Sequence, residues 1–70
     1  MSRATISVLG STGSIGRNTL DVIRQNPRFE VYALSAHRNI ELLLDQCKMF
    51  QPRSSVVTDE INAVRFAKLL

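Results

Sequence analysis

Three glycines at a regular spacing, Gly10, Gly13 and Gly16, are the residues whose types and positions most clearly point to chemistry. Between a strand and a helix, Gly10 permits a tight turn, Gly13 lets the backbone approach a pyrophosphate, and Gly16 lets the helix pack closely. The free N–H groups and the dipole of the first helical turn attract phosphate. The predicted phosphate site comprises Gly10, Ser11, Thr12, Gly13, Ser14, Ile15 and Gly16.

Two other interpretations of this turn were weighed. A P-loop is excluded because no Lys-Ser or Lys-Thr pair follows the glycines. Glycines and serines can also form a merely flexible loop. The strand pattern before the turn and the helix pattern after it favour dinucleotide binding instead.

The residues after the second predicted strand distinguish between the two nicotinamide cofactors. An acidic residue there binds the adenosine ribose of NAD and repels the extra phosphate of NADP. This chain has no carboxylate at that point, and Arg38 can hold a 2′-phosphate through charge-assisted hydrogen bonds. The sequence therefore predicts NADPH, with a second group of site residues made up of Ser35, Arg38 and Asn39.

Three apolar or β-branched runs are typical of buried parallel strands, at residues 5–9, 29–36 and 55–57. Helical periodicity separates them. The first predicted helix runs from Ile15 to the Asn26-Pro27 pair, and its apolar face is expected to contain Ile15, Thr19, Val22 and Ile23.

The second predicted helix starts after the N-cap Asn39 and ends at Pro52. Its apolar face is expected to contain Ile40, Leu43, Leu44, Cys47 and Phe50. Thr58 is expected to cap the third helix, whose apolar face is expected to contain Ala63, Phe66, Ala67 and Leu70.

The alternation of strands and helices predicts an α/β fold of the Rossmann type, three-layered and incomplete, with parallel strand order 3-2-1. The first two helices are expected to cover one face of the sheet and the third to begin covering the other. The first strand is left with an open edge. The apolar helical pattern continues to Leu70, so residues 1–70 are expected to be the amino-terminal part of a longer NADPH-binding domain.

Composition argues for a soluble, cytoplasmic protein. The net charge of +3 comes from scattered basic residues, so neither nucleic acid nor a membrane is an expected partner. A lone Cys47 is expected to be a buried thiol without chemistry. The carboxylates of Asp21, Asp45 and Asp59 form no sequence cluster and are assigned to solvated surfaces, so no metal ligand is predicted in this segment.

Several stretches of the chain together resemble the amino terminus of the 1-deoxy-D-xylulose 5-phosphate reductoisomerases. They are Leu9 to Gly16 (LGSTGSIG), Asn18 to Ile23, Asn26-Pro27, Ala33-Leu34, Ala36 and Asn39. The resemblance implies an NADPH-dependent enzyme that converts 1-deoxy-D-xylulose 5-phosphate into 2-C-methyl-D-erythritol 4-phosphate in the non-mevalonate isoprenoid pathway. It also implies a divalent metal (Mg or Mn), a phosphosugar substrate and a homodimer.

The resemblance further places cofactor contacts at Thr12, Gly13, Ser14 and Ile15 and at His37, Arg38 and Asn39. The family usually has glycine and lysine where His37 and Arg38 stand. Arginine preserves the charge, whereas His37 either stacks on the adenine or faces solvent. The family's metal and substrate ligands lie beyond residue 70, so this segment alone is not expected to catalyse.

Three alternatives remain open at this point. An extended short-chain dehydrogenase or reductase shares the glycine spacing. A non-catalytic redox sensor would bind NADP without turnover. A purely structural interaction module would give no reason for the spacing of the three glycines or for the presence of Arg38.

Overall fold

The computed structural model describes residues 4–70, which form three strands and three helices in strict alternation. The elements are β1 (Ala4–Val8), α1 (Ser14–Arg24), β2 (Phe29–Ala36), α2 (Ile40–Phe50), β3 (Ser54–Val57) and α3 (Glu60–Leu69). The boundaries of β2 are those expected from the sequence. The other elements lie within two residues of the expected positions.

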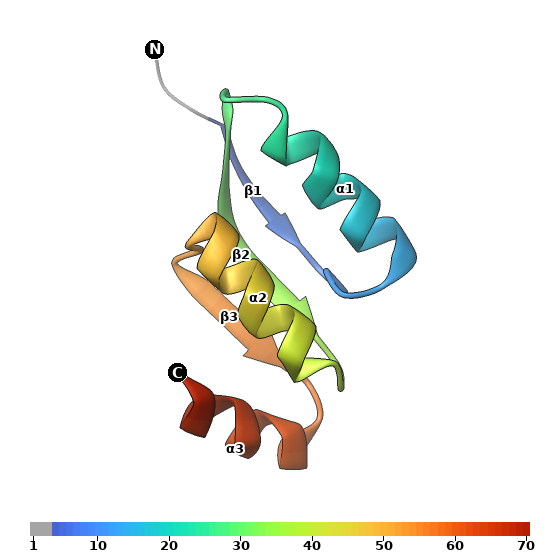
Figure 1. Cartoon of the computed structure of the whole chain (residues 1–70), viewed down its shortest axis with the longest axis vertical. Coiled ribbons are helices and arrows are strands. Elements are labelled where there is room, and N and C mark those ends of the chain that lie inside the picture. The colour runs from blue at the N-terminus through green and yellow to red at the C-terminus, as the bar shows by residue number, and fades with distance from the viewer. Residues whose placement is uncertain (1–3) are drawn as a thin grey trace.

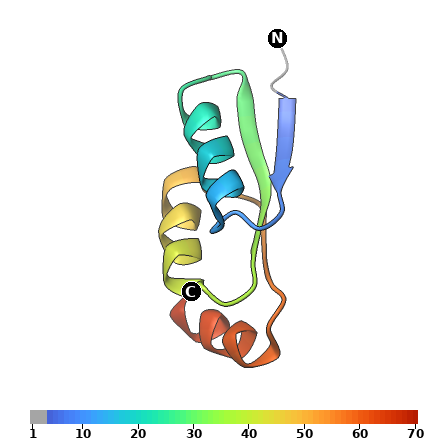
Figure 2. The ribbon, with the colours of Figure 1, turned by 90° about the vertical axis from the view of Figure 1, so that its right-hand side faces the viewer.

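The strands form one parallel sheet in the order β1-β2-β3, with β2 in the centre. This confirms the α/β class and the predicted strand order. Figure 1 shows the three strands running in the same direction, and Figure 2 shows α1 and α2 on one side of them. The register between β1 and β2 shifts after Ile6, which pairs with Val31, whereas Ser7 pairs with Ala33. Tyr32 is therefore the extra residue of a bulge in β2.

The core lies between the sheet and the two crossover helices. Leu34 and Leu43 are its most deeply buried side chains, from the central strand and from α2. The buried apolar side chains as a group are Val8, Leu20, Ile23, Val31, Leu34, Ala36, Ile40, Leu43 and Phe66. Burial of these faces, more than helix propensity, stabilises such short helices.

The expected buried face of α1 is wrong for three of its four residues. Ile15 is 83% exposed, Val22 is 62% exposed and Thr19 is exposed, whereas Gly16, Leu20 and Ile23 face the core. The reason is steric. Gly16 packs so closely on the preceding turn that it fixes the rotation of the helix about its axis.

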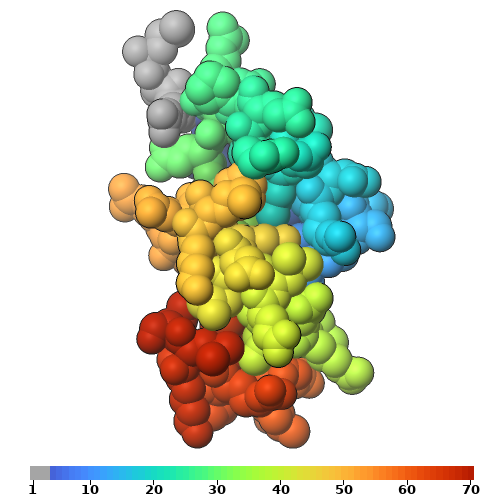
Figure 3. All heavy atoms as spheres, viewed as in Figure 1, coloured from blue at the N-terminus to red at the C-terminus, as the bar shows by residue number. Residues whose placement is uncertain are grey.

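The position of α3 also differs from the expectation. It packs against α2 and β3 and places Phe66 in the core beside α2, so it does not begin a layer on the other face. Figure 2 shows it beyond the carboxyl ends of the strands, and Figures 1 and 3 show α1 and α3 at opposite ends of the molecule with α2 between them. Because only a narrow stripe of α3 is covered, Ala63 is half-buried and Ala67 and Leu70 are exposed.

The N-cap of α3 is Asp59 and not Thr58. A side-chain oxygen of Asp59 accepts a hydrogen bond from the Asn62 N–H at 3.1 Å. The N-cap of α2 is Asn39, as expected, and its Oδ1 accepts from the Leu42 N–H at 3.2 Å. Gln51, in the left-handed region, ends α2 just before Pro52.

Candidate cofactor-binding site

The glycine turn leaves the carboxyl end of β1 and leads directly into α1. Gly10 has φ of +68°, a conformation that side chains disfavour, so glycine is required there for the backbone alone. A methyl group on Gly16 would overlap the Gly10 carbonyl oxygen and lie 2.6 Å from the Ser11 Cα. Two of the three glycines are thus explained by the turn itself.

Gly13 has no such internal explanation. Its φ is −79°, which any residue can adopt, and a Cβ there would make only an ordinary contact with the Gly10 carbonyl oxygen at 3.4 Å. It is exposed and forms the N-cap of α1 without a side-chain hydrogen bond. The absence of a Cβ at Gly13 leaves open the approach to the helix N-terminus, which is what the backbone needs to contact a phosphate.

The first turn of α1 presents donors that the helix itself cannot satisfy. The N–H groups of Ser14, Ile15 and Gly16 have no carbonyl one helical turn earlier to bind, and the first helical bond runs from the Arg17 N–H to the Gly13 oxygen at 2.9 Å. The hydroxyls of Thr12 and Ser14 make no hydrogen bond to another residue within 4–70. A hollow of about 470 Å³ lies against this turn, between the end of β1 and α1. Donors and space for an anion therefore occur together.

Ser11 is a predicted site residue whose side chain turns inward. It is fully buried, and its Oγ donates to Gln46 Oε1 at 2.7 Å. Its N–H and hydroxyl both reach the Ser35 carbonyl oxygen, at 2.7 Å and 3.2 Å. The Ser11 side chain therefore holds the turn in place and faces away from the hollow.

Gln46 is the residue that sequence analysis missed. It lies on the buried face of α2, and its Nε2 donates to the Ser11 carbonyl oxygen at 2.8 Å while its Oε1 accepts from the Ser11 hydroxyl. The signal was present in the spacing, because position 46 lies three residues after Leu43 on the same helical face. A buried amide at such a position must have partners, and here it braces the glycine turn.

The end of β2 joins the glycine turn at the same edge of the sheet. Ser35 Oγ accepts from the Gly10 N–H at 2.9 Å, which ties the two segments together. His37, Arg38 and Asn39 follow in the loop to α2, and all three are exposed. Among residues 4–70 the one ion pair joins Arg24 and Asp21, so no carboxylate engages the Arg38 guanidinium. Both predicted groups of site residues thus lie at the carboxyl edge, where open α/β sheets bind ligands.

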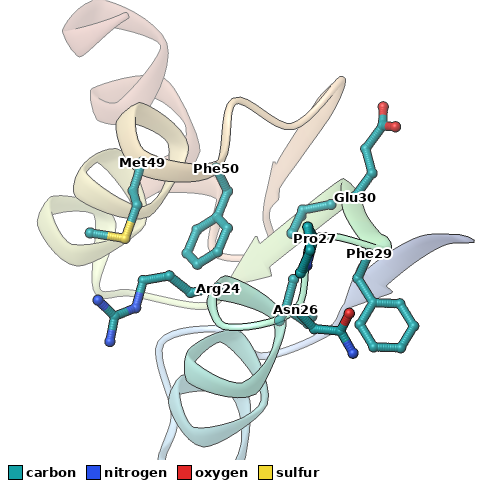
Figure 4. A pocket seen from close by; sticks show the side chains of 9 residues that line it. Arg24, Asn26, Pro27, Phe29, Glu30, Met49 and Phe50 are labelled. Atoms are coloured by element: carbon teal, nitrogen blue, oxygen red, sulfur yellow. The ribbon is translucent and has the colours of Figure 1, made fainter. Parts of the chain in front are cut away.

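A second hollow, of about 260 Å³, opens at the opposite edge. Figure 4 shows it between the ends of α1 and α2, with Arg24 and Met49 on one side and Phe29 and Glu30 on the other. It faces the amino end of β2 and contains neither a glycine turn nor a helix N-terminus. The carboxyl edge is therefore the better candidate for binding a dinucleotide.

Comparison with known proteins decides the family. The sequence profile of the 1-deoxy-D-xylulose 5-phosphate reductoisomerases matches residues 6–70. The chain belongs to this family. It is 54% identical over 66 residues to the 1-deoxy-D-xylulose 5-phosphate reductoisomerase of Paraburkholderia xenovorans (strain LB400), covering 93% of the chain and 16% of that relative.

Other reductoisomerases are similar to the same stretch. The relatives from Laribacter hongkongensis and Photorhabdus laumondii subsp. laumondii are 50% and 44% identical over 66 residues, which cover 93% of the chain and 17% of each relative. The chain thus spans about one sixth of the length of the curated reductoisomerases that it matches. The cofactor contacts inferred from the family resemblance stay predictions for this chain.

Two further observations on the described residues concern metal ions and membranes. Within the described residues, no three His, Cys, Asp or Glu side chains come close enough together to hold a metal ion. None of the helices in residues 4–70 has the length and apolar character needed to cross a membrane.

Cys47 is half-buried and unpaired, and burial raises the pKa of its thiol while a hydrogen bond with Ser55 acts in the opposite direction.

Proposed function

We propose that residues 1–70 belong to the NADPH-binding domain of a complete reductoisomerase. That enzyme converts 1-deoxy-D-xylulose 5-phosphate into 2-C-methyl-D-erythritol 4-phosphate in the non-mevalonate isoprenoid pathway. The observation that carries the proposal is the meeting of two features at one sheet edge. They are the N-terminus of α1, whose cap Gly13 makes no side-chain hydrogen bond, and the guanidinium of Arg38, which forms no ion pair within residues 4–70.

The residues of this chain act by binding and orientation. The N–H groups at the start of α1 hold the pyrophosphate, supported by the helix dipole and by the hydroxyls of Thr12 and Ser14. Arg38, with Ser35 and Asn39 nearby, holds the 2′-phosphate. When bound, NADPH supplies the hydride for the reductive step. The metal and the phosphosugar bind to other parts of the complete enzyme, so the segment alone does not catalyse.

Arg38 is the residue that should discriminate between the cofactors. A charge-assisted hydrogen bond contributes roughly 1.5–3 kcal/mol, which corresponds to about ten- to a hundredfold in affinity. We expect Arg38→Ala in the complete protein to raise the Kd for NADPH by that factor and to leave the Kd for NADH nearly unchanged. Arg28 is an exposed arginine directly before the amino end of β2. Arg28→Ala is therefore the matched control and should change neither the Kd for NADPH nor the Kd for NADH.

The proposed activity has a direct assay. The complete protein with a divalent metal and NADPH should form 2-C-methyl-D-erythritol 4-phosphate, and oxidation of NADPH should be stoichiometric with it. Binding of NADPH without turnover of this substrate would favour the redox-sensor alternative. An equal loss of affinity for NADPH and NADH in Arg38→Ala would contradict the assignment of the 2′-phosphate.

A further inference from the structure

A side-chain hydrogen bond joins the loops that follow β2 and β3. His37 Nδ1 and Thr58 Oγ1 are 2.7 Å apart, and the tautomer of the imidazole determines which of the two donates. The Thr58 N–H also donates to the Ala36 carbonyl oxygen at 3.0 Å. Since the β2–β3 ladder ends with the pair Ala36 and Val57, Thr58 extends the contact between the two chain segments beyond the sheet.

This contact anchors one side of Arg38, and the start of α2 anchors the other. His37 is held by Thr58, whereas Asn39 is held by its cap hydrogen bond to the Leu42 N–H. The Arg38 carbonyl oxygen accepts from the Ile40 N–H at 2.8 Å. The backbone of Arg38 is thus fixed between two anchored neighbours while its side chain stays exposed. A loop ordered before binding loses less conformational entropy when a ligand arrives.

The acidic group of Asp59, close enough to Arg38 to feel its charge, is engaged by the start of α3. The Asp59 carboxylate accepts from Asn62 N at 3.1 Å and from Asn62 Nδ2 at 2.7 Å. Its pKa is lowered, chiefly by the backbone hydrogen bond from Asn62, and the nearby His37 and Arg38 act in the same direction. The carboxylate is therefore engaged as the cap of α3 and forms no ion pair with the guanidinium.

We propose that Thr58 is a positioning residue for cofactor discrimination: through its hydrogen bond to His37 it holds the backbone of Arg38 where the guanidinium meets the 2′-phosphate. This inference rests on the proposed function, because it requires Arg38 to contact that phosphate. The predicted site residues include neither Thr58 nor any residue of β3. Thr58 contacts the site from the loop that follows β3.

The test measures the Kd of NADPH and of NADH for variants of the complete protein. Thr58→Val removes the hydroxyl and keeps the shape, and we expect it to weaken NADPH binding about three- to tenfold, the range of one net hydrogen bond, with less than a twofold effect on NADH. Thr58→Ser keeps the hydroxyl and should stay within about twofold of the wild type for both cofactors. Thr5→Val, an exposed threonine on β1, is the matched control.

The pair is tested by a double-mutant cycle. His37→Ala should resemble Thr58→Val. The double variant should lose no more NADPH affinity than the single variant with the larger loss, because both substitutions remove the same contact. The inference is overturned if the two losses multiply, if Thr58→Val has no effect, or if it weakens NADPH and NADH equally. A normal NADPH preference in Arg38→Ala would overturn the proposed function, whereas loss in Arg38→Ala with an unaffected Thr58→Val would overturn only the role of Thr58.

Discussion

Gln46 offers the sharpest test of how the glycine turn is held. Gln46→Leu keeps the volume of the side chain but removes both hydrogen bonds to Ser11, at 2.7 Å and 2.8 Å. The Ser11 hydroxyl can still donate to the Ser35 carbonyl oxygen at 3.2 Å, whereas the Ser11 carbonyl loses its partner inside the protein. One lost bond costs about 1 kcal/mol and an orphaned buried carbonyl about 1–3 kcal/mol, so we expect a loss of about 2–4 kcal/mol.

The assay is urea unfolding of the complete protein, combined with the Kd of NADPH and NADH. Because the turn would loosen as a whole, both cofactors should bind more weakly by a similar factor. Gln25→Leu removes an exposed glutamine at the end of α1 and should change the free energy of unfolding by less than about 0.5 kcal/mol. The reasoning is refuted if Gln46→Leu lowers the free energy of unfolding by less than the about 0.5 kcal/mol allowed for Gln25→Leu, or if it weakens the binding of NADPH but not of NADH.

Two further predictions concern the glycines and the cysteine. Gly16→Ala should cost about 3 kcal/mol or more in unfolding experiments because its methyl would overlap backbone atoms, whereas Gly13→Ala should keep the unfolding midpoint and weaken NADPH binding about tenfold or more. The reverse pattern would contradict the separate roles given to the two glycines. For Cys47, the alkylation rate followed by mass spectrometry should rise with pH around a midpoint above that of an exposed cysteine, because burial raises the pKa of the thiol. A midpoint below that of an exposed cysteine would be inconsistent with the buried environment.

Local signals in the sequence were sufficient for the order of elements and for the glycine turn. The strand at residues 29–36 stands out because apolar and β-branched residues are bounded by Pro27 and by the polar run after Ala36. Asn39 was recognisable as a cap because it directly precedes a helical period. These features depend on neighbours within a few residues, which is why the chain alone predicts them.

Features that depend on contacts across the fold were not predictable in the same way. The rotation of α1 follows from the close approach of Gly16 to the Gly10 carbonyl, and a broad apolar pattern could not locate that contact. Thr58 and Asp59 are both good caps, and the hydrogen bond between Thr58 and His37 leaves the cap of α3 to Asp59. The buried amide of Gln46 was overlooked because polar residues are usually exposed.

The position of bound NADPH tests the central claim most directly. A crystal structure of the complete protein with NADPH should place the pyrophosphate against the N–H groups of Ser14, Ile15 and Gly16, with the 2′-phosphate at Arg38. A cofactor bound at the amino edge of the sheet, beside Arg24 and Phe29, or a 2′-phosphate directed away from Arg38, would contradict the account.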